Sequence, residues 1–217
     1  MNLIQSKELI NIFTLLNKEK IEYLLMRNIN NELPNNLEIG KDIDILVYKK
    51  DEKQFVNFFK ANNYETINHP FKYGIFLYGV DRFEFKYNNN NNILFDLNFQ
   101  IAVRSLDAGQ WIPLDQSIQE SAWKNRRFEQ LNEDFGYWTL SYEDEFVSLV
   151  ARSIFDKKEF QSGYVKRIDE LSSIIEKLNV IEKLNMVFFK FTPFLMDYID
   201  NKDYENIIKN YLKFKEY

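Results

Sequence analysis

The sequence predicts an α+β fold, with a mixed sheet flanked by helices and followed by a C-terminal helical region. Two observations lead to this prediction. Residues 1–140 combine stretches of helical spacing with stretches in which apolar and polar residues alternate, as they do in strands. Residues 141–217 show helical spacing only. No Gly/Ser linker separates the two parts, so we expect two domains, 1–140 and 141–217, that pack closely and share a cleft.

The first third of the chain alternates predicted helices and strands. A helix is expected over 6–17, capped by its first serine, and a strand over 22–26. A polar loop covers 29–39, and the next strand begins at Asp42. A second helix follows the N-cap candidate Asp51 and should stop near 62–63.

The pattern then changes to period two, which predicts a hairpin or meander over 64–103. If Phe95 and Leu97 face the core, Asp96, Asn98 and Gln100 share the opposite face. The stretch 104–140 is expected to be an irregular connector. Beyond it, a capping box starting at Ser141 opens the helical part. Further helices are expected over 167–178, 181–195 and 204–214.

Composition excludes several kinds of chemistry. The 217 residues are 45% hydrophobic and 17% aromatic, which suits a packed core. The absence of cysteine excludes disulfides, thiolate zinc sites and cysteine nucleophiles, and a single histidine removes most Ser-His-Asp schemes. A net charge of −5 disfavours non-specific coating of nucleic acid, although a local basic patch for one phosphorylated substrate remains compatible with it.

The expected location is cytoplasmic. No stretch reaches the roughly 20 apolar residues that a membrane-spanning helix requires, so we expect no insertion into a membrane. The first residues lack the basic and then apolar pattern of a signal peptide.

The most informative feature is a pair of carboxylates at the start of an apolar strand. Side chains of a strand alternate between faces, so Asp42 and Asp44 lie together while Ile43 and Ile45 point the other way. Two like charges this close repel each other, and a shared cation relieves the repulsion. Oxygen ligands of this kind suit Mg²⁺. Asp96 also lies on the polar face of an apolar strand, so the three carboxylates could meet at one point.

Such an acidic triad fits transfer of a nucleotidyl group. Three carboxylates hold two Mg²⁺ ions about 3.5–4 Å apart for in-line displacement at an α-phosphorus. Carboxylates more than about 8 Å from one another would contradict this hypothesis, because a two-metal site needs close ligands.

The same residues resemble those of the nucleotidyltransferase superfamily, which includes polymerase β, CCA-adding enzymes and aminoglycoside nucleotidyltransferases. The chain is most similar to an uncharacterised bacterial nucleotidyltransferase group that is associated with polysaccharide biosynthesis. The likeness covers roughly residues 20–155. It rests on four segments, namely Gly-Lys-Asp-Ile-Asp-Ile-Leu-Val (40–47), Phe-Asp-Leu-Asn-Phe (95–99), Ala-Trp (122–123) and Leu-Ser-Tyr-Glu-Asp (140–144).

The resemblance implies roles for individual residues in a catalytic domain over 1–140. It implies that Asp42 and Asp44 bind both metal ions, while Asp96 binds one and assists deprotonation of the acceptor. The superfamily usually grips the triphosphate with a Gly-Ser pair, where this chain has Met-Arg-Asn (26–28). Nucleotide binding is therefore expected from other residues, unless the donor is not an NTP. The candidates are Arg27, Asn28, Gly40 and Lys41.

Acceptor binding is assigned to a second set of residues. Asn98 stands where the family commonly has histidine, and a basic cluster lies in the connector. The candidates for acceptor binding are Asn98, Lys124, Arg126 and Arg127.

The expected reaction is Mg²⁺-dependent transfer of a nucleoside monophosphate from NTP to a small molecule. A sugar or polyol phosphate for surface polysaccharide is implied by the resemblance alone. A toxin-like nucleotidyltransferase acting on tRNA or protein is one alternative, which the acidic composition disfavours. A metal-dependent glycosyltransferase is another, but there the Asp-x-Asp motif ends a strand and here it begins one. A non-catalytic nucleotide-binding module is the third.

Overall fold

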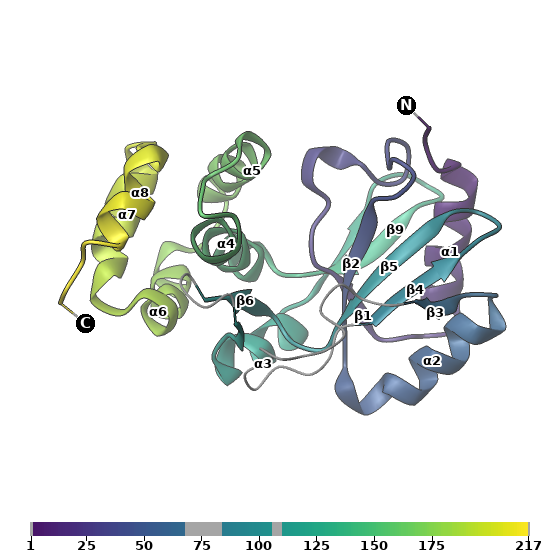
Figure 1. Ribbon diagram of the computed structural model, residues 1–217. Helices are drawn as coiled ribbons and strands as arrows, with labels where there is room; N and C mark the ends of the chain where they lie inside the picture. The colour runs from purple at the N-terminus through teal and green to yellow at the C-terminus, as the bar shows by residue number, and fades with distance from the viewer. Residues whose placement is uncertain (1, 68–83, 106–109, 217) are drawn as a thin grey trace.

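The computed structural model describes residues 2–67, 84–105 and 110–216 (Figure 1). The strands are β1 (Tyr23–Leu25), β2 (Asp42–Val47), β3 (Glu65–Ile67), β4 (Glu84–Asn88), β5 (Ile93–Asn98), β6 (Ala102–Arg104), β7 (Trp111–Pro113), β8 (Arg127–Gln130) and β9 (Gly136–Thr139). The helices are α1 (Ser6–Lys18), α2 (Glu52–Ala61), α3 (Gln116–Lys124), α4 (Tyr142–Arg152), α5 (Ser162–Ser172), α6 (Lys177–Phe188), α7 (Thr192–Asp200) and α8 (Tyr204–Tyr211). The predicted fold class is confirmed, because a mixed sheet with helices precedes a helical region.

The main sheet has seven strands in the order β3-β4-β5-β2-β1-β9-β8, and β6 pairs with β7 in a separate ribbon. β2 is parallel to β5 and antiparallel to β1, so the acidic strand lies in the interior of the sheet. A central strand has both neighbours hydrogen-bonded, which fixes the directions of its side chains.

The two faces of the sheet have separate apolar clusters. Ile43, Ile45 and Val47 of β2 pack in the cluster that contains α1 and α2. Leu46, on the other face, belongs to the cluster that contains α3, α4 and the C-terminal helices. Figure 1 shows α4 and α5 between the sheet and the helices α6 to α8. Since side chains alternate, Asp42 and Asp44 lie on the face that α4 approaches.

The N-terminal elements follow the sequence-based expectation closely. α1, β1 and α2 begin and end within two residues of the predicted bounds. The predicted caps are less accurate, because α1 has Gln5 at its N-cap and Asp51 forms no side-chain cap bond to α2. The alternating pattern over 64–103 gives β3, β4 and β5 in the described residues, while 68–83 lie outside them.

The prediction of an irregular connector over 104–140 is wrong. This stretch contains β7, α3, β8 and β9. α3 begins after Asp115, whose carboxylate accepts a hydrogen bond from the backbone N–H of Ser117 at 2.9 Å. β9 pairs with β1, where Leu25 lies opposite Thr139. A strand of four residues whose partner lies more than 100 residues away produces too little local pattern to be recognised.

The C-terminal helices also differ from the prediction. α5 begins at Ser162, before the predicted start at 167, and ends at Ser172. The single helix expected over 181–195 is two helices, because Phe189 has φ 48° and interrupts the helical backbone. The predicted boundary at residue 140 lies between β9 and α4. Leu24 and Leu46 of the sheet share one apolar cluster with these helices. No helix of the described residues is long and apolar enough to cross a membrane.

Candidate active site

The three predicted carboxylates converge at the start of β2 and on the neighbouring strand. Asp44 of β2 lies opposite Asp96 of β5 in the parallel register, and Asp42 precedes Asp44 by two residues on the same face. One carboxylate oxygen from each residue lies within 4.8 Å of the other two. This separation is well below the limit of about 8 Å for a two-metal site. Oxygen donors at this spacing fit a divalent ion such as Mg²⁺.

Asp42 and Asp44 repel each other. Burial of part of the Asp42 side chain raises the pKa of its carboxyl, and the negative charge of Asp44 raises it further. The Asp42 side chain still keeps part of its surface exposed. A cation held between the carboxylates would remove this repulsion.

Arg27 is the partner of Asp44. Its Nη2 lies 2.5 Å from Asp44 Oδ2, with 12% of the arginine side chain and 17% of the aspartate side chain exposed. Arg27 follows β1, and the backbone N–H of Met26 donates to the carbonyl of Asp44 at 3.0 Å. The strand pairing therefore places the guanidinium beside the carboxylate.

A cavity of about 600 Å³ opens on one side of the acids. Asp42 and Asp44 line it, but Asp96 is not among its described lining residues. Its cationic lining residues are Arg27, Lys41, Arg152 and Lys157. Its walls come from the loop after β1 and from the first residues of α5. A Cβ on Gly163 of α5 would lie 3.0 Å from the Ile29 side chain, so only glycine permits this close approach without a shift.

A smaller cavity of about 260 Å³ lies on the other side. Asp42, Asp44 and Asp96 all line it, together with several aromatic and polar side chains. These side chains include Phe85, Asn98, Arg104, Trp111 and Asp156. Arg27, Arg152 and Lys157 line both cavities, so the acids and these three cations separate the two spaces.

Arg152 is held in place by residues of the helical region. Its Nε donates to Tyr164 Oη at 3.1 Å, and its Nη1 donates to Asp156 Oδ2 at 3.0 Å. Asp156 Oδ1 in turn accepts from the backbone N–H of Arg104 at 2.7 Å. Burial lowers the pKa of Arg152, but the charges of Asp44 and Asp156 more than offset it, so the pKa is raised overall. Arg152 is therefore a fixed positive charge.

The other predicted nucleotide-binding residues belong to the loop between β1 and β2, where Lys41 and Asn28 have structural partners. Lys41 lines the larger cavity and its Nζ lies 2.7 Å from Glu32 Oε1. Asn28 also lines that cavity, and its Oδ1 accepts from the backbone N–H of Leu33 at 2.9 Å. Gly40 has φ 94°, a conformation that favours glycine, and lies outside the described lining of both cavities. These contacts shape the loop between β1 and β2.

The predicted acceptor-binding residues separate into two groups. Asn98 lies two residues after Asp96 and lines the smaller cavity. Lys124, Arg126 and Arg127 are absent from the described lining of either cavity. Arg126 Nη2 donates to Glu22 Oε1 at 3.1 Å, and its guanidinium lies 5.2 Å from the centre of the Trp138 ring.

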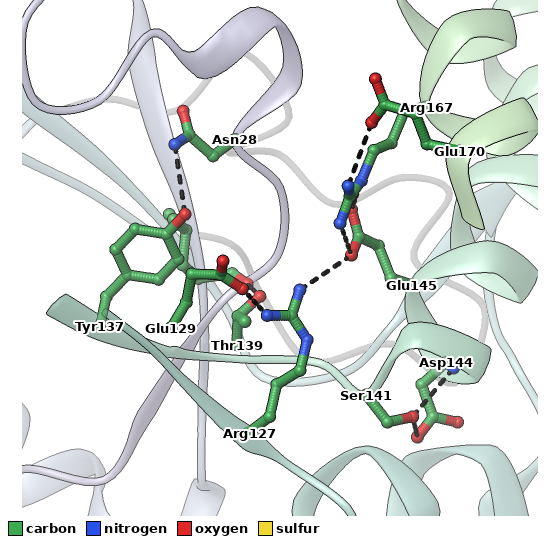
Figure 2. A network of polar contacts seen from close by, with 11 residues as sticks. Asn28, Arg127, Glu129, Tyr137, Thr139, Ser141, Asp144, Glu145, Arg167 and Glu170 are labelled. Atoms are coloured by element: carbon green, nitrogen blue, oxygen red, sulfur yellow. Dashed lines mark hydrogen bonds and ion pairs between the residues drawn. The ribbon is translucent and has the colours of Figure 1, made fainter. Parts of the chain in front are cut away.

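Arg127 takes part in a network between the sheet edge and the helices (Figure 2). It contacts Glu129 and donates from Nη2 to Glu145 Oε2 at 3.2 Å. Glu145 also accepts from Arg167 Nε at 2.7 Å and from Arg167 Nη2 at 2.8 Å. The network connects β8 to α4 and α5, so the contacts of Arg127 hold the edge of the sheet against these helices.

No protein-family model matches the chain, and no curated protein matches it. Among solved structures, the chain is similar to the lincomycin-bound crystal structure of the lincosamide antibiotic adenylyltransferase LnuA. The sequence identity is 13%, the TM-score is 0.47, and the match covers 80% of this chain and 100% of that chain. At this identity and TM-score the likeness assigns no substrate and no family.

Several residues that line the cavities were not predicted from the sequence. Arg152, Asp156 and Lys157 come from the end of α4 and the π-helical turn η3 (Ser153–Lys157), and Trp111 comes from β7. One signal was present in the sequence. Arg152 interrupts the apolar run Leu-Val-Ala-Arg-Ser-Ile-Phe (149–155), and a charge inside such a run needs a partner.

Proposed function

We propose that this protein is a metal-dependent nucleotidyltransferase that transfers a nucleoside monophosphate from an NTP to a small molecule. The observation that carries the proposal is the position of Asp42, Asp44 and Asp96. Their ligand oxygens lie within 4.8 Å of one another, between two cavities of different character. Divalent ions bound there would neutralise the transferred phosphate and lower the pKa of the attacking hydroxyl.

The larger cavity is the proposed donor site. A triphosphate brings several negative charges, and the cavity supplies Arg27, Lys41, Arg152 and Lys157. Lys157 is exposed, and no described residue forms an ion pair with it. Arg152 is fixed by Tyr164 and Asp156, so it presents its charge without rearrangement. A fixed positive charge stabilises a transferring phosphoryl group without a cost of reorganisation during the reaction.

The smaller cavity is the proposed acceptor site. Asp96 lines it and is absent from the described lining of the larger one, so Asp96 is suited to act on the acceptor hydroxyl. Trp111 and Phe85 offer ring surfaces, while Asn98 offers an amide for orientation. The volume of about 260 Å³ lies just below the range of about 300–1,000 Å³ that is typical of ligand pockets, so it suits a small acceptor.

The reaction exchanges a phosphoanhydride bond of the NTP for a phosphoester bond to the acceptor. The acceptor oxygen forms a bond to the α-phosphorus, and the bond from that phosphorus to the α–β bridging oxygen breaks. Pyrophosphate leaves with the electron pair of the broken bond. The hydroxyl proton passes to the Asp96 carboxylate or to solvent. The protein contributes position and charge, which are the main sources of acceleration in such transfers.

A sugar or polyol phosphate is the first acceptor class to test. Arg104 lines the acceptor cavity and offers a guanidinium for an anionic group. A place for this transfer in polysaccharide synthesis rests on the sequence resemblance alone.

The proposal is tested by incubating the full chain with Mg²⁺, each of the four NTPs and panels of sugar and polyol phosphates. Pyrophosphate release and the mass of the nucleotidyl adduct are measured, with Asp44→Asn as the inactive control. We expect a metal-dependent adduct from the wild type only. A total tRNA arm tests the macromolecular alternative. Adducts that persist in Asp44→Asn, or none in any arm, would overturn the proposal.

A further inference from the structure

Arg27 contacts a carboxylate oxygen of Asp44 that would serve as a ligand for a metal ion. Its Nη2 lies 2.5 Å from Asp44 Oδ2, and both side chains are more than four-fifths buried. A charge-assisted contact of this kind is among the stronger hydrogen bonds in proteins. A divalent ion held by the three carboxylates would use an oxygen of Asp44 as a ligand, so the contact with Arg27 would compete with the ion.

The two guanidinium groups near Asp44 differ in their other contacts. Arg152 is held by Tyr164 and Asp156, whereas Arg27 has no polar side-chain contact besides Asp44 in the part of the chain that the structure describes. Arg27 also lines the larger cavity, so a rotation of its side chain can reach that space. Of the two, Arg27 is the group that is free to leave Asp44.

We infer that Arg27 holds the place of a metal ion in the metal-free protein and moves to the triphosphate when the ion binds. This inference rests on the proposed function. A divalent ion at the carboxylates repels the neighbouring guanidinium, and a triphosphate in the larger cavity attracts it. Arg27 thereby couples the two binding events: it weakens metal binding before the nucleotide arrives and strengthens nucleotide binding afterwards. Such coupling is reciprocal.

The first test measures Mn²⁺ affinity of the nucleotide-free full chain by calorimetry. Arg27→Gln should bind Mn²⁺ at least about fivefold more tightly than the wild type, which is the lower end of typical coupling between sites. Arg126→Gln is the matched control, because it removes the same charge from an arginine paired with Glu22. Its Mn²⁺ affinity should equal that of the wild type. Unchanged or weaker binding by Arg27→Gln would overturn the inference.

The second test measures binding of inorganic tripolyphosphate at saturating Mn²⁺, which requires no knowledge of the base. Arg27→Gln should bind it several-fold more weakly than the wild type and than Arg126→Gln. Equal affinities would contradict a movement of Arg27 to the phosphates.

A third test needs no substitution at Arg27 in the measured protein and applies if Arg27→Gln fails to fold. The side-chain Nε–H signal of Arg27 is followed by NMR during a Mg²⁺ titration, and its assignment comes from Arg27→Lys. The signal should shift as the ion binds, while that of Arg126 stays in place. A stationary Arg27 signal during proven Mg²⁺ binding would refute the inference. None of these measurements depends on turnover. The inference about Arg27 can therefore fail in a protein that transfers nucleotides, and it can hold in a protein for which no activity is detected.

Discussion

Asp44 and Asp96 lie directly opposite each other on the neighbouring parallel strands β2 and β5. Because side chains alternate along a strand, a register slip of one residue would turn Asp96 to the face covered by α1 and α2. The register is fixed from that other face, where Ile43 and Ile45 of β2 and Phe95 of β5 are almost completely buried. Apolar packing on one face of the sheet thus sets the spacing of the carboxylates on the other.

Replacement of Asp42 should stabilise the metal-free protein. The pKa of Asp42 is raised in the folded state, so the wild type loses stability as the pH rises through that pKa and the carboxyl ionises. Asp42→Asn cannot ionise and should therefore be more stable than the wild type at pH 7, while losing activity. Urea unfolding measured between pH 3 and pH 7 tests this, and a difference between the two proteins that does not grow with pH would contradict it.

Mg²⁺ should reverse this order. The ion should raise the melting temperature of the wild type and have little effect on Asp42→Asn, because a ligand stabilises only the state that binds it. Equal shifts in both proteins would show that the ion binds elsewhere.

Lys157→Gln should raise the KM for NTP about tenfold, since a hydrogen bond to a charged group contributes about 1.5–3 kcal/mol. The side chain is exposed and lines both cavities, so the fold should be unaffected. Lys158→Gln is the matched control, because Lys158 is the next residue and lies outside the described lining of both. Steady-state kinetics with varied NTP tests the pair, and equal effects of the two substitutions would count against the donor site.

Trp111→Ala should raise the KM for the acceptor by roughly fivefold and leave the KM for NTP unchanged, because loss of a ring contact costs about 0.5–1.5 kcal/mol. Trp111 lines only the smaller of the two cavities among the described residues. The neighbouring Ile112 is 38% exposed and lies outside the described lining of that cavity, so Ile112→Ala serves as the control. If the substitution raised the KM for NTP and not that for the acceptor, the smaller cavity would be the donor site, which would contradict the proposed assignment.

Glu145→Gln should destabilise the protein by about 3 kcal/mol, because it leaves two arginines without their buried counter-charge. Glu145 is 6% exposed and contacts both Arg127 and Arg167 (Figure 2). Glu170 contacts Arg167 too but is 49% exposed, so Glu170→Gln should cost less than about 0.5 kcal/mol. Urea unfolding compares the two variants, and equal losses would show that burial of Glu145 contributes nothing.

The sequence predicted the acidic triad because that information is local. Asp42, Asp44 and Asp96 each stand in an alternating strand, and the pattern alone assigns them to a face. The cavities could not be predicted in this way. Arg152 and Trp111 reach the acids through tertiary packing of α4 and of the ribbon formed by β6 and β7, and no spacing in the sequence specifies that contact.

The short elements between 104 and 140 show the same limit. β8 and β9 have four residues each, and a Cβ at Gly136 would lie 2.6 Å from the Phe128 ring, so any other residue there would force the ring to move. This constraint depends on a partner strand, so it is invisible to local periodicity. Lys124, Arg126 and Arg127 formed an apparent basic patch in the sequence, but the fold pairs Arg126 and Arg127 with Glu22 and Glu145.

The central claim is that the three carboxylates hold divalent ions for nucleotidyl transfer. The most direct test is a crystal soaked with Mn²⁺ and an α,β-methylene NTP analogue, in which anomalous scattering locates the metal. We predict anomalous peaks coordinated by Asp42, Asp44 and Asp96, with the α-phosphate of the analogue beside them and the triphosphate in the larger cavity. Carboxylates without a metal ion, in a crystal where the analogue is bound elsewhere, would contradict the account.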